Sequence, residues 1–423
     1  MRAAPEIKGW CPSASRPMAS GDGLLLRADT CGARLTLKQA QEIALIAQDC
    51  GNGSIDLTQR AQIQLRGIQP ETLVTAQNRL AAAGLAPTDG EKSPPVSIVV
   101  SPFATGVYDA EVLMALLTAA VRAEPSLRTL PDKFLFLIDH GGAPGLAKVD
   151  ADIRLEAFGD RIALVLDGAR EQAALVETAA ACAAAVALAR AFAALRTGRL
   201  FERRRMRALV TEVGAAAVFA AADLRAGPYA SCCVAARVRD WLGATENCGA
   251  AFAGFAAPFG RIQAAEFSRL LAALEKLDAR ELRLTPWRGL LAPAPSRRGA
   301  DEMAETAQRF GYVTNAKDPR LAVVACPGAP ECLQALGSTR EAALALAPFA
   351  RALSPGGGVG LHISGCAKGC ANPSTAPLTL VCNGSGFDLI RDGSAGDPPA
   401  VTGLDIADIP HFLETQETSC LAR

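Results

Sequence analysis

Four cysteines stand in two short segments rich in glycine and proline near the C-terminus. Five residues separate Cys326 from Cys332 in CPGAPEC, and three residues separate Cys366 from Cys370 in CAKGC. Four thiolates are the ligand set of a 4Fe–4S cluster, and glycine lets backbone N–H groups approach the cluster sulfides. Structural zinc prefers about two to four residues between paired cysteines, so the longer spacer favours a cluster. Zinc and unrelated buried thiols stay as alternatives.

Polar residues alternate with apolar ones between Thr58 and Gly67, in TQRAQIQLRG. If this segment is a strand, its polar side chains share one face and its apolar side chains share the other. The residues of the polar face are Arg60, Gln62, Gln64 and Arg66, and the cations Arg27, Lys133 and Arg288 could extend it. Guanidinium groups bind carboxylates in a bidentate way, so this face fits an anionic ligand. A solvated edge strand is the alternative.

A repeat runs through the whole chain at a near-constant spacing. The segment IDLT ends at Thr58 and LRLT ends at Thr285, 227 positions later, while VVSP and VACP end 225 positions apart. The apolar run 135–140 aligns with 359–364 at a spacing of 224. Such a repeat predicts two copies of one architecture. The positions that match Cys326 and Cys332 are then Ser101 and Val107, so one cluster is expected, in the second half.

Helix signals flank several segments of the repeat. Thr36 with Gln39 three residues later is a capping-box start, and Gly51 is a stop, so a helix is expected between them. Its counterpart in the second half is expected at about 263–277. The alanine-rich stretch 171–195 is predicted to be the long helix that joins the two halves.

Composition excludes several classes of protein. The 423 residues carry 43 Lys plus Arg and 43 Asp plus Glu, so there is no net positive field to bind nucleic acid. No uncharged apolar run approaches the roughly 20 residues of a membrane span, and no secretory signal is seen at the start, so a cytoplasmic location is expected. Thiols stay reduced there, and clustered cysteines indicate a metal more often than disulfides.

These features together resemble a known superfamily. The two cysteine pairs, the T-x-R-x-x-x-Q-x-R-G segment and the repeat are similar to those of the sirohaem-dependent nitrite and sulfite reductases. Within this superfamily, the segments GWCP at 9–12 and HISGCAKGCANP at 362–373 resemble those of the precorrin-3B synthases of oxygen-dependent cobalamin biosynthesis. The resemblance implies an internally duplicated α+β fold. Its expected parts are a ferredoxin-like half-domain at 1–90, an α/β domain without cluster at 91–225, a second half-domain at 226–318, and an α/β domain with the 4Fe–4S cluster at 319–423.

The resemblance also implies an activity and its site. The family's reaction is an NADH- and dioxygen-dependent monooxygenation of precorrin-3A, a polycarboxylate tetrapyrrole, with closure of a ring A acetate lactone. The implied cluster ligands are Cys326, Cys332, Cys366 and Cys370, and the implied contacts to substrate carboxylates are Arg27, Arg60, Gln64, Arg66, Lys133 and Arg288. A non-haem iron belongs to the family, but the sequence identifies neither its ligands nor a catalytic residue. No G-x-G-x-x-G motif is apparent, so a separate reductase is a plausible electron-donating partner.

Departures from the reductase pattern favour a synthase. Arg27 and Lys133 match the reductase oxyanion site, but Leu135 replaces its second lysine and Lys92–Pro95 lacks its second arginine. Positioned cations are the main electrostatic aid to such a reductase. A sirohaem-dependent sulfite or nitrite reductase remains the first alternative, and a non-catalytic iron–sulfur electron carrier the second. Among the three histidines, His362 lies four positions before Cys366, so it is the candidate for a role at the cysteine site. A purely structural histidine is the alternative.

Overall fold

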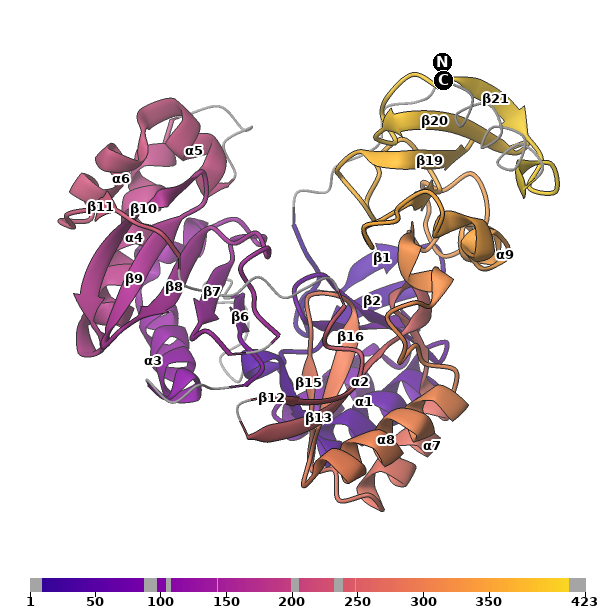
Figure 1. The fold of residues 1–423 in the computed structure, drawn as a ribbon, viewed down its shortest axis with the longest axis horizontal. Coiled ribbons are helices and arrows are strands. Elements are labelled where there is room, and N and C mark those ends of the chain that lie inside the picture. Colours follow the sequence, from indigo (N-terminus) through magenta and orange to yellow (C-terminus); the bar gives the residue numbers. More distant parts are fainter. Residues whose placement is uncertain are drawn as a thin grey trace.

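The computed structural model describes residues 10–86, 97–103, 108–142, 144–198, 205–231, 239–247 and 249–410. These residues form three lobes (Figure 1). Elements of both repeats lie together in the central lobe, while the described residues between 97 and 231 form one flanking lobe and residues 319–410 form the other. The positions Lys92–Pro95, Val107 and His411 lie outside the described residues.

The central lobe contains two five-stranded sheets. The strand order of the first is β1 (Met18–Ser20), β2 (Gly23–Arg27), β5 (Ile63–Ile68), β4 (Ser54–Leu57), β14 (Arg261–Gln263). The order of the second is β12 (Gly243–Asn247), β13 (Ala250–Ala256), β16 (Gly289–Ala294), β15 (Glu281–Leu284), β3 (Arg34–Thr36).

The two repeats exchange an edge strand. β14 of the second repeat pairs antiparallel with β4, and β3 of the first repeat pairs antiparallel with β15. The exchange is reciprocal, because β3 and β14 occupy the same position of the repeat, 227 residues apart. Residues of both repeats also share one hydrophobic core. The two half-domains are therefore one packed unit, in which each sheet is completed by the other repeat.

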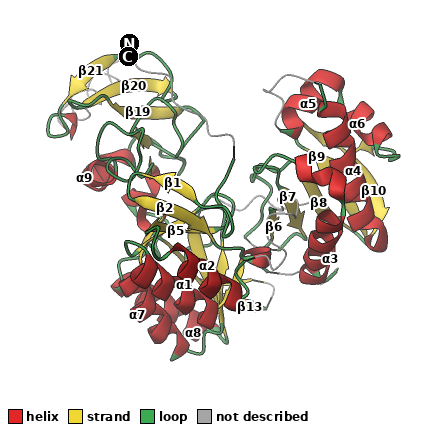
Figure 2. Ribbon diagram, turned by 180° about the vertical axis from the view of Figure 1, so that it is seen from behind, coloured by secondary structure: helices red, strands yellow, loops and turns green. Residues whose placement is uncertain are grey.

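Four helices lie together on one side of this lobe (Figure 2). They are α1 (Leu37–Cys50), α2 (Leu73–Ala82), α7 (Ala264–Glu275) and α8 (Arg297–Arg309). The predicted capping box of α1 is confirmed: the Thr36 hydroxyl accepts from Gln39 N at 3.2 Å, and Gln39 Oε1 accepts from Thr36 N at 3.0 Å. Buried Ile43 and Ala47 on α1 join the shared core.

The two flanking lobes share a common strand arrangement, which differs from that of the central lobe. The first has the strand order β11 (Gly227–Pro228), β10 (Ala169–Glu177), β9 (Arg161–Leu166), β8 (Ile153–Phe158), β7 (Phe136–Asp139), β6 (Ile98–Val100), with α3 (Ala110–Ala123), α4 (Ala181–Arg196), α5 (Met206–Val213) and α6 (Ala215–Ala221). The second has β17 (Val323–Ala325), β18 (Leu361–Ser364), β19 (Ala376–Cys382), β20 (Phe387–Gly393), β21 (Val401–Leu404), with α9 (Arg340–Ala350). In both, three parallel strands are followed by an antiparallel one.

Strand register corrects one part of the predicted repeat. Val99 lies opposite Leu137 in the β6–β7 pair, and Val324 lies opposite His362 in the β17–β18 pair, so the spacing here is 225. The predicted alignment of 135–140 with 359–364 is wrong by one residue. Two buried apolar runs can be superposed at several offsets, whereas backbone pairing allows only one. His362 is thus the counterpart of Leu137.

The predicted joining helix at 171–195 is wrong in its first part. Residues up to Glu177 belong to β10, which pairs antiparallel with β9, and α4 begins at Ala181. The alanines of the segment alternate between two cores, with Ala173 in one and Ala174 in the other, which is the period of a strand. Pairing with a neighbouring strand overrides the helix propensity of alanine.

One helical stretch among the described residues, Thr178–Arg196, has the length and composition that would allow it to cross a membrane. Within it, Leu188 and Phe192 are fully buried in the core of the lobe, where α4 packs against β8 and β9. Packing in this core accounts for its apolar composition.

The repeat offers a matched test of the α1 capping box. Thr36→Ala removes the hydroxyl acceptor of an N-cap, so the free energy of unfolding should fall by about 1 kcal/mol. Gln263→Ala is the control, because Gln263 is the N-cap of α7 and its side chain makes no cap hydrogen bond. Equal decreases in the free energy of unfolding for the two variants, measured by urea unfolding, would contradict a stabilising role of the Thr36 cap.

Candidate functional site

The four cysteines lie on two loops that follow neighbouring parallel strands. Cys326 comes directly after β17, and Cys366 follows β18 by two residues. The backbone N–H of Cys326 donates to the Ile363 carbonyl at 3.3 Å, which extends the pairing of the two strands. The N–H of Gly365 donates to Cys326 Sγ at 3.1 Å. The topology therefore brings the two cysteine pairs together at one edge of the sheet.

The thiols act on one another electrostatically. Burial raises the pKa of Cys326, the N–H groups of Gly365 and Gly328 oppose this, and Cys332 and Cys366 raise it further. Burial also raises the pKa of Cys370; the charge of Lys368 opposes this, and the other three thiols add to it. Four mutually repelling thiolates need bound cations to stay ionised together. The donor set fits an iron centre for this reason.

Tight packing explains the glycines of these loops. A Cβ at Gly328 would lie 2.7 Å from Thr339 Oγ1, and a Cβ at Gly365 would lie 2.6 Å from Ala335 Cβ. Gly369 has a φ of +62°, which side chains rarely adopt. The N–H groups of Gly365 and Gly328 hydrogen-bond to the Cys326 thiol, and N–H donors of this kind stabilise the sulfur atoms of an iron–sulfur cluster.

No group of three or more His, Cys, Asp or Glu in the described part of the chain is arranged around a single metal ion. The chemistry of the donors is a separate matter: four thiolates are the ligand set that a 4Fe–4S cluster takes.

The first repeat has the same strands without the thiols. Ser101 N donates to the Ile138 carbonyl at 2.9 Å, as Cys326 N does to the Ile363 carbonyl. Ser101 therefore occupies the position of Cys326, and its hydroxyl donates to Asp139 at 2.8 Å. At the spacing of 225, Cys366 and Cys370 correspond to Gly141 and Gly145.

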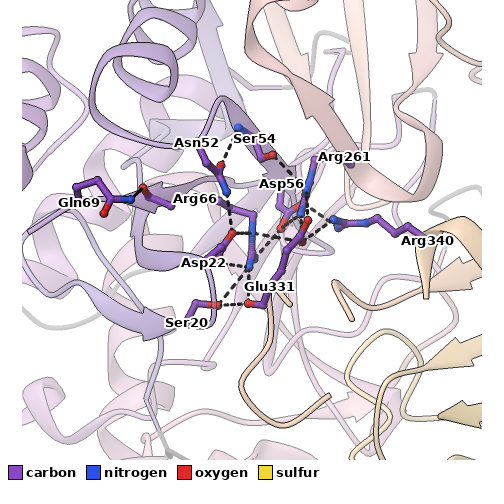
Figure 3. Close-up of polar contacts among 11 residues, drawn as sticks. Ser20, Asp22, Asn52, Ser54, Asp56, Arg66, Gln69, Arg261, Glu331 and Arg340 are labelled. Atoms are coloured by element: carbon purple, nitrogen blue, oxygen red, sulfur yellow. Dashed lines mark hydrogen bonds and ion pairs between the residues drawn. The ribbon is translucent and has the colours of Figure 1, made fainter. Parts of the chain in front are cut away.

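Glu331, the residue before Cys332, fastens the first cysteine loop to the central lobe (Figure 3). Its backbone carbonyl accepts from Ser20 Oγ at 2.5 Å, from Gly21 N at 3.1 Å and from Arg66 Nη2 at 3.0 Å. A Cβ at Gly21 would lie 2.0 Å from the Pro330 carbonyl oxygen, so this approach requires glycine.

An ion-pair network with Asp56 and Arg66 at its buried centre surrounds this contact (Figure 3). The Glu331 carboxylate accepts from Arg261 Nη2 at 2.6 Å and from Arg340 Nη1 at 3.0 Å. The Asp56 carboxylate accepts from Arg261 Nε at 2.7 Å, from Arg340 Nη2 at 3.0 Å and from Arg66 Nη1 at 3.1 Å. Asp22 then accepts from Arg66 Nε at 2.9 Å. We call these residues the Glu331 network: Asp22, Asp56, Arg66, Arg261, Glu331 and Arg340.

Asp56 is the centre of the network's charge balance. It is 7 % exposed, and burial alone would raise the pKa of its carboxyl group. The guanidinium groups of Arg340 and Arg261 outweigh burial and hold this pKa well below its usual range. Of the six network residues, only Arg66 was predicted from the sequence to belong to the site. Charged residues inside otherwise apolar strands, such as Asp56 in SIDL, were the available signal.

The predicted polar face exists from Gln64 onward. Gln64 lies opposite Arg27 on one side and Asp56 on the other, and Asp56 lies opposite Arg261. Ile63 and Leu65 point to the buried core, as the alternation predicts. Arg66 also lies on this face but is 3 % exposed, and its guanidinium group is bound to carboxylates of the Glu331 network.

The prediction that Arg60 and Gln62 continue this strand is wrong. Thr58 N donates to the Gln62 carbonyl at 2.9 Å, the Thr58 hydroxyl accepts from the N–H groups of Arg60 and Gln62, and Ala61 has a φ of 52°. The segment is a turn, because the threonine hydroxyl satisfies backbone groups that a strand would pair. Alternation of residue types cannot distinguish this turn from a strand end.

The second repeat makes an equivalent turn at Thr285–Gly289. The Thr285 hydroxyl accepts from Gly289 N at 3.1 Å, and Arg288 has a φ of 58°. Both turns reach the loop of the second cysteine pair: Gln59 Nε2 donates to the Ala371 carbonyl at 3.3 Å, and Arg288 Nη2 donates to it at 3.4 Å. Ala371 follows Cys370 directly. The duplication thus delivers two related turns to one loop.

Arg27 and Arg60 form a cationic site beside the first turn. The Nε of each is buried and has no hydrogen-bond partner among the described residues. Burial lowers the pKa of Arg60; the Cys11 thiol opposes this, and the charges of Arg205 and Arg27 add to it. An anion would offset this repulsion, so the pair fits a carboxylate ligand.

Lys133 lies near the N-terminal segment that also approaches Arg60. Cys11 N donates to Asp132 Oδ2 at 2.7 Å, which brings the N-terminal segment against the residue before Lys133. The side chain of Lys133 is exposed. Leu135, which stands where the reductase pattern has a lysine, is buried in the shared core.

Comparisons with known proteins agree with this architecture. Residues 16–83 match the nitrite/sulfite reductase ferredoxin-like half domain family. The chain is 30 % identical over 407 residues to a protein named precorrin-3B synthase from a Sinorhizobium species, and the match covers 93 % of this chain and 84 % of that protein. The solved structure of the Mycobacterium tuberculosis NirA protein superposes with a TM-score of 0.72 at 17 % identity, covering 92 % of this chain and 79 % of that one. The fold is the duplicated α+β fold of the nitrite and sulfite reductases.

The Glu331 network makes a testable contribution to stability. Asp56→Asn leaves the buried Arg66 and the half-buried Arg261 and Arg340 with one carboxylate fewer, so the free energy of unfolding should fall by roughly 3–5 kcal/mol. Because the pKa of Asp56 is lowered in the folded state, its contribution is present above the ordinary carboxyl pKa and is lost as the pH falls. The variant should therefore show a shallower loss of stability in urea unfolding on acidification. Asp301→Asn, which breaks the exposed pair with Arg297, is the control, and equal losses would refute the network's role.

Proposed function

Because the chain belongs to the precorrin-3B synthase family, we propose that it is an oxidoreductase that converts precorrin-3A to precorrin-3B in aerobic cobalamin biosynthesis. In this monooxygenation, one oxygen atom of dioxygen hydroxylates the meso carbon between rings A and D, and the other leaves as water. The two electrons come from NADH, through a separate reductase or directly. The ring A acetate then closes a lactone. We further propose that the enzyme acts in the cytoplasm.

The turn at Thr58–Gln62 is the observation that carries this proposal. One of its residues, Gln59, contacts the carbonyl of Ala371 beside Cys370, and the next, Arg60, joins Arg27 in a cationic site with buried, unpaired Nε atoms. A ligand bound by Arg60 would therefore lie next to the second cysteine loop. A polycarboxylate tetrapyrrole has the charge and size to span such a site.

We propose separate roles for the polar residues. Arg27, Arg60 and Lys133 would bind substrate carboxylates, Gln64 would donate to one from its position beside Arg27, and Arg288 would bind one from the second repeat's turn. Arg66 would position these groups through the Glu331 network, because its own guanidinium group already binds Asp22 and Asp56. These residues fix the orientation of the macrocycle and exclude water from its edge.

Cys326, Cys332, Cys366 and Cys370 would hold a 4Fe–4S cluster, which when bound supplies one-electron transfer beside the substrate. Gly365 N–H, which donates to Cys326, would stabilise the bound thiolate. A sulfite or nitrite reductase would need a second lysine where Leu135 is buried, so the reductase activity is not favoured.

Loss of one ligand tests the cluster. Cys366→Ser should abolish the visible absorbance of the anaerobically purified protein and the EPR signal of its reduced form, because a serine hydroxyl is a poor replacement for a thiolate. Cys182→Ser is the control: that thiol contacts the Leu113 carbonyl in the other flanking lobe. An unchanged spectrum of Cys366→Ser would reject this ligand set.

A turnover experiment tests the activity and the cationic site together. Anaerobic protein receives precorrin-3A and reductant, then ¹⁸O-labelled dioxygen, and product is followed by mass spectrometry. One labelled oxygen atom should enter a lactone product. Arg60→Ala should raise KM for precorrin-3A about 10- to 150-fold, because a charge-assisted hydrogen bond contributes roughly 1.5–3 kcal/mol.

Two controls accompany this experiment. Arg60→Lys retains the charge but not the bidentate geometry and should fall between wild type and alanine. Arg298→Ala, an exposed residue of α8, should leave KM unchanged. Stoichiometric sirohaem in the purified protein with no lactone product would instead favour a reductase, and a cluster with no tetrapyrrole binding would favour an electron carrier.

A further inference from the structure

His362 is a buried polar side chain whose partners are missing. It lies in the middle of β18 between Val324 of β17 and Thr379 of β19, and its exposed fraction is 0 %. Neither Nδ1 nor Nε2 has a hydrogen-bond partner among the described residues. A buried imidazole without partners is costly, so a native protein that retains one normally has a group that satisfies it.

The ring lies against the second cysteine loop. Its strand neighbours Leu361 and Ile363 pack in the core with α9, so His362 points to the opposite face of the sheet. A Cβ at Gly369 would lie 3.6 Å from His362 Cε1, which sets the imidazole in contact distance of the turn between Cys366 and Cys370. Arg288, which contacts the end of the same loop, lies on this side too.

The protonation state of the ring suits a donor of one hydrogen bond. Burial and the neighbouring charge of Arg288 lower the pKa of His362 to about 4, so the ring is neutral at physiological pH. A neutral imidazole carries one N–H donor and one acceptor nitrogen. A sulfur atom that bears negative charge is a suitable acceptor for the N–H group.

The first repeat supplies an internal comparison. Strand register makes Leu137 the counterpart of His362, and Leu137 is fully buried. That repeat has Ser101 in place of Cys326 and glycines in place of the second cysteine pair. Within one fold, the copy without thiols has leucine at this position and the copy with thiols has histidine. The histidine is therefore not required by the sheet itself.

We propose that His362 is a positioning residue of the iron–sulfur cluster, donating its ring N–H to a cluster sulfide or to a ligand thiolate. This inference rests on the cluster assignment of the proposed function, not on the tetrapyrrole chemistry. An N–H bond to a cluster sulfur stabilises the more negative, reduced cluster, so His362 raises the midpoint potential at which the cluster accepts an electron.

Pulsed EPR of the wild-type protein tests the contact directly. The protein is labelled with ¹⁵N-histidine and its cluster is reduced. A ¹⁵N coupling to the cluster spin is expected, and it should vanish in His362→Leu. A reduced cluster with no histidine coupling in wild type overturns the proposal for His362 alone and leaves the cluster assignment standing. Failure of wild type to assemble any cluster overturns both.

Redox titration tests the consequence. His362→Leu, which installs the first repeat's residue, should shift the midpoint potential to more negative values at unchanged iron and sulfide content. His362→Gln retains an N–H donor and should lie closer to wild type. Ile363→Val, on the opposite face of β18, is the matched control and should leave the midpoint potential unchanged. A wild-type potential in His362→Leu, with a full cluster, overturns the proposal.

Discussion

Three arginines and three carboxylates hold the loop between Cys326 and Cys332 against the sheet of the first repeat. Withdrawing these charges from water, fully at Asp56 and Arg66 and partly at the others, is favourable only because each carboxylate of the Glu331 network meets at least one guanidinium group and the charges balance. Glu331 contributes both its carboxylate and its backbone carbonyl, and the next residue is Cys332. The position of that thiol therefore depends on contacts that come from four other segments of the chain.

The exchange of edge strands explains how these segments meet. Asp56 lies on β4 of the first repeat and Arg261 on β14 of the second, and the two strands pair in the same sheet. Without the exchange, the first sheet would end at β4, and the buried Asp56 carboxylate would lose its bond from Arg261. The same reciprocal packing carries the turns at Thr58–Gln62 and Thr285–Gly289 to the carbonyl of Ala371. Duplication thus produced a composite site that neither repeat contains alone.

The two repeats have diverged in chemistry while keeping the same strands. The second repeat carries the thiols and His362, and the first carries Ser101, Leu137 and the cationic pair Arg27 and Arg60. This division suits a protein in which one copy binds an anionic ligand and the other handles electrons. A net charge of zero conceals it, because carboxylates pair with many described arginines, such as Arg66 and Arg79, while Arg27 and Arg60 retain unpaired Nε atoms.

The amino-acid sequence by itself determined what depends on near neighbours: the capping box at Thr36, the cysteine pairs, the repeat, and the alternation that points Gln64 away from Leu65. Tertiary structure decided the rest. Leu137 became the counterpart of His362 through strand pairing, and β10 formed where alanine propensity favoured a helix. Arg66 found Asp22, Asp56 and Glu331 as its partners, whereas Arg27 and Arg60 kept unpaired Nε atoms. Residue type and spacing specify which bonds a side chain can make, but a partner distant in the chain is selected only when the fold brings the two together.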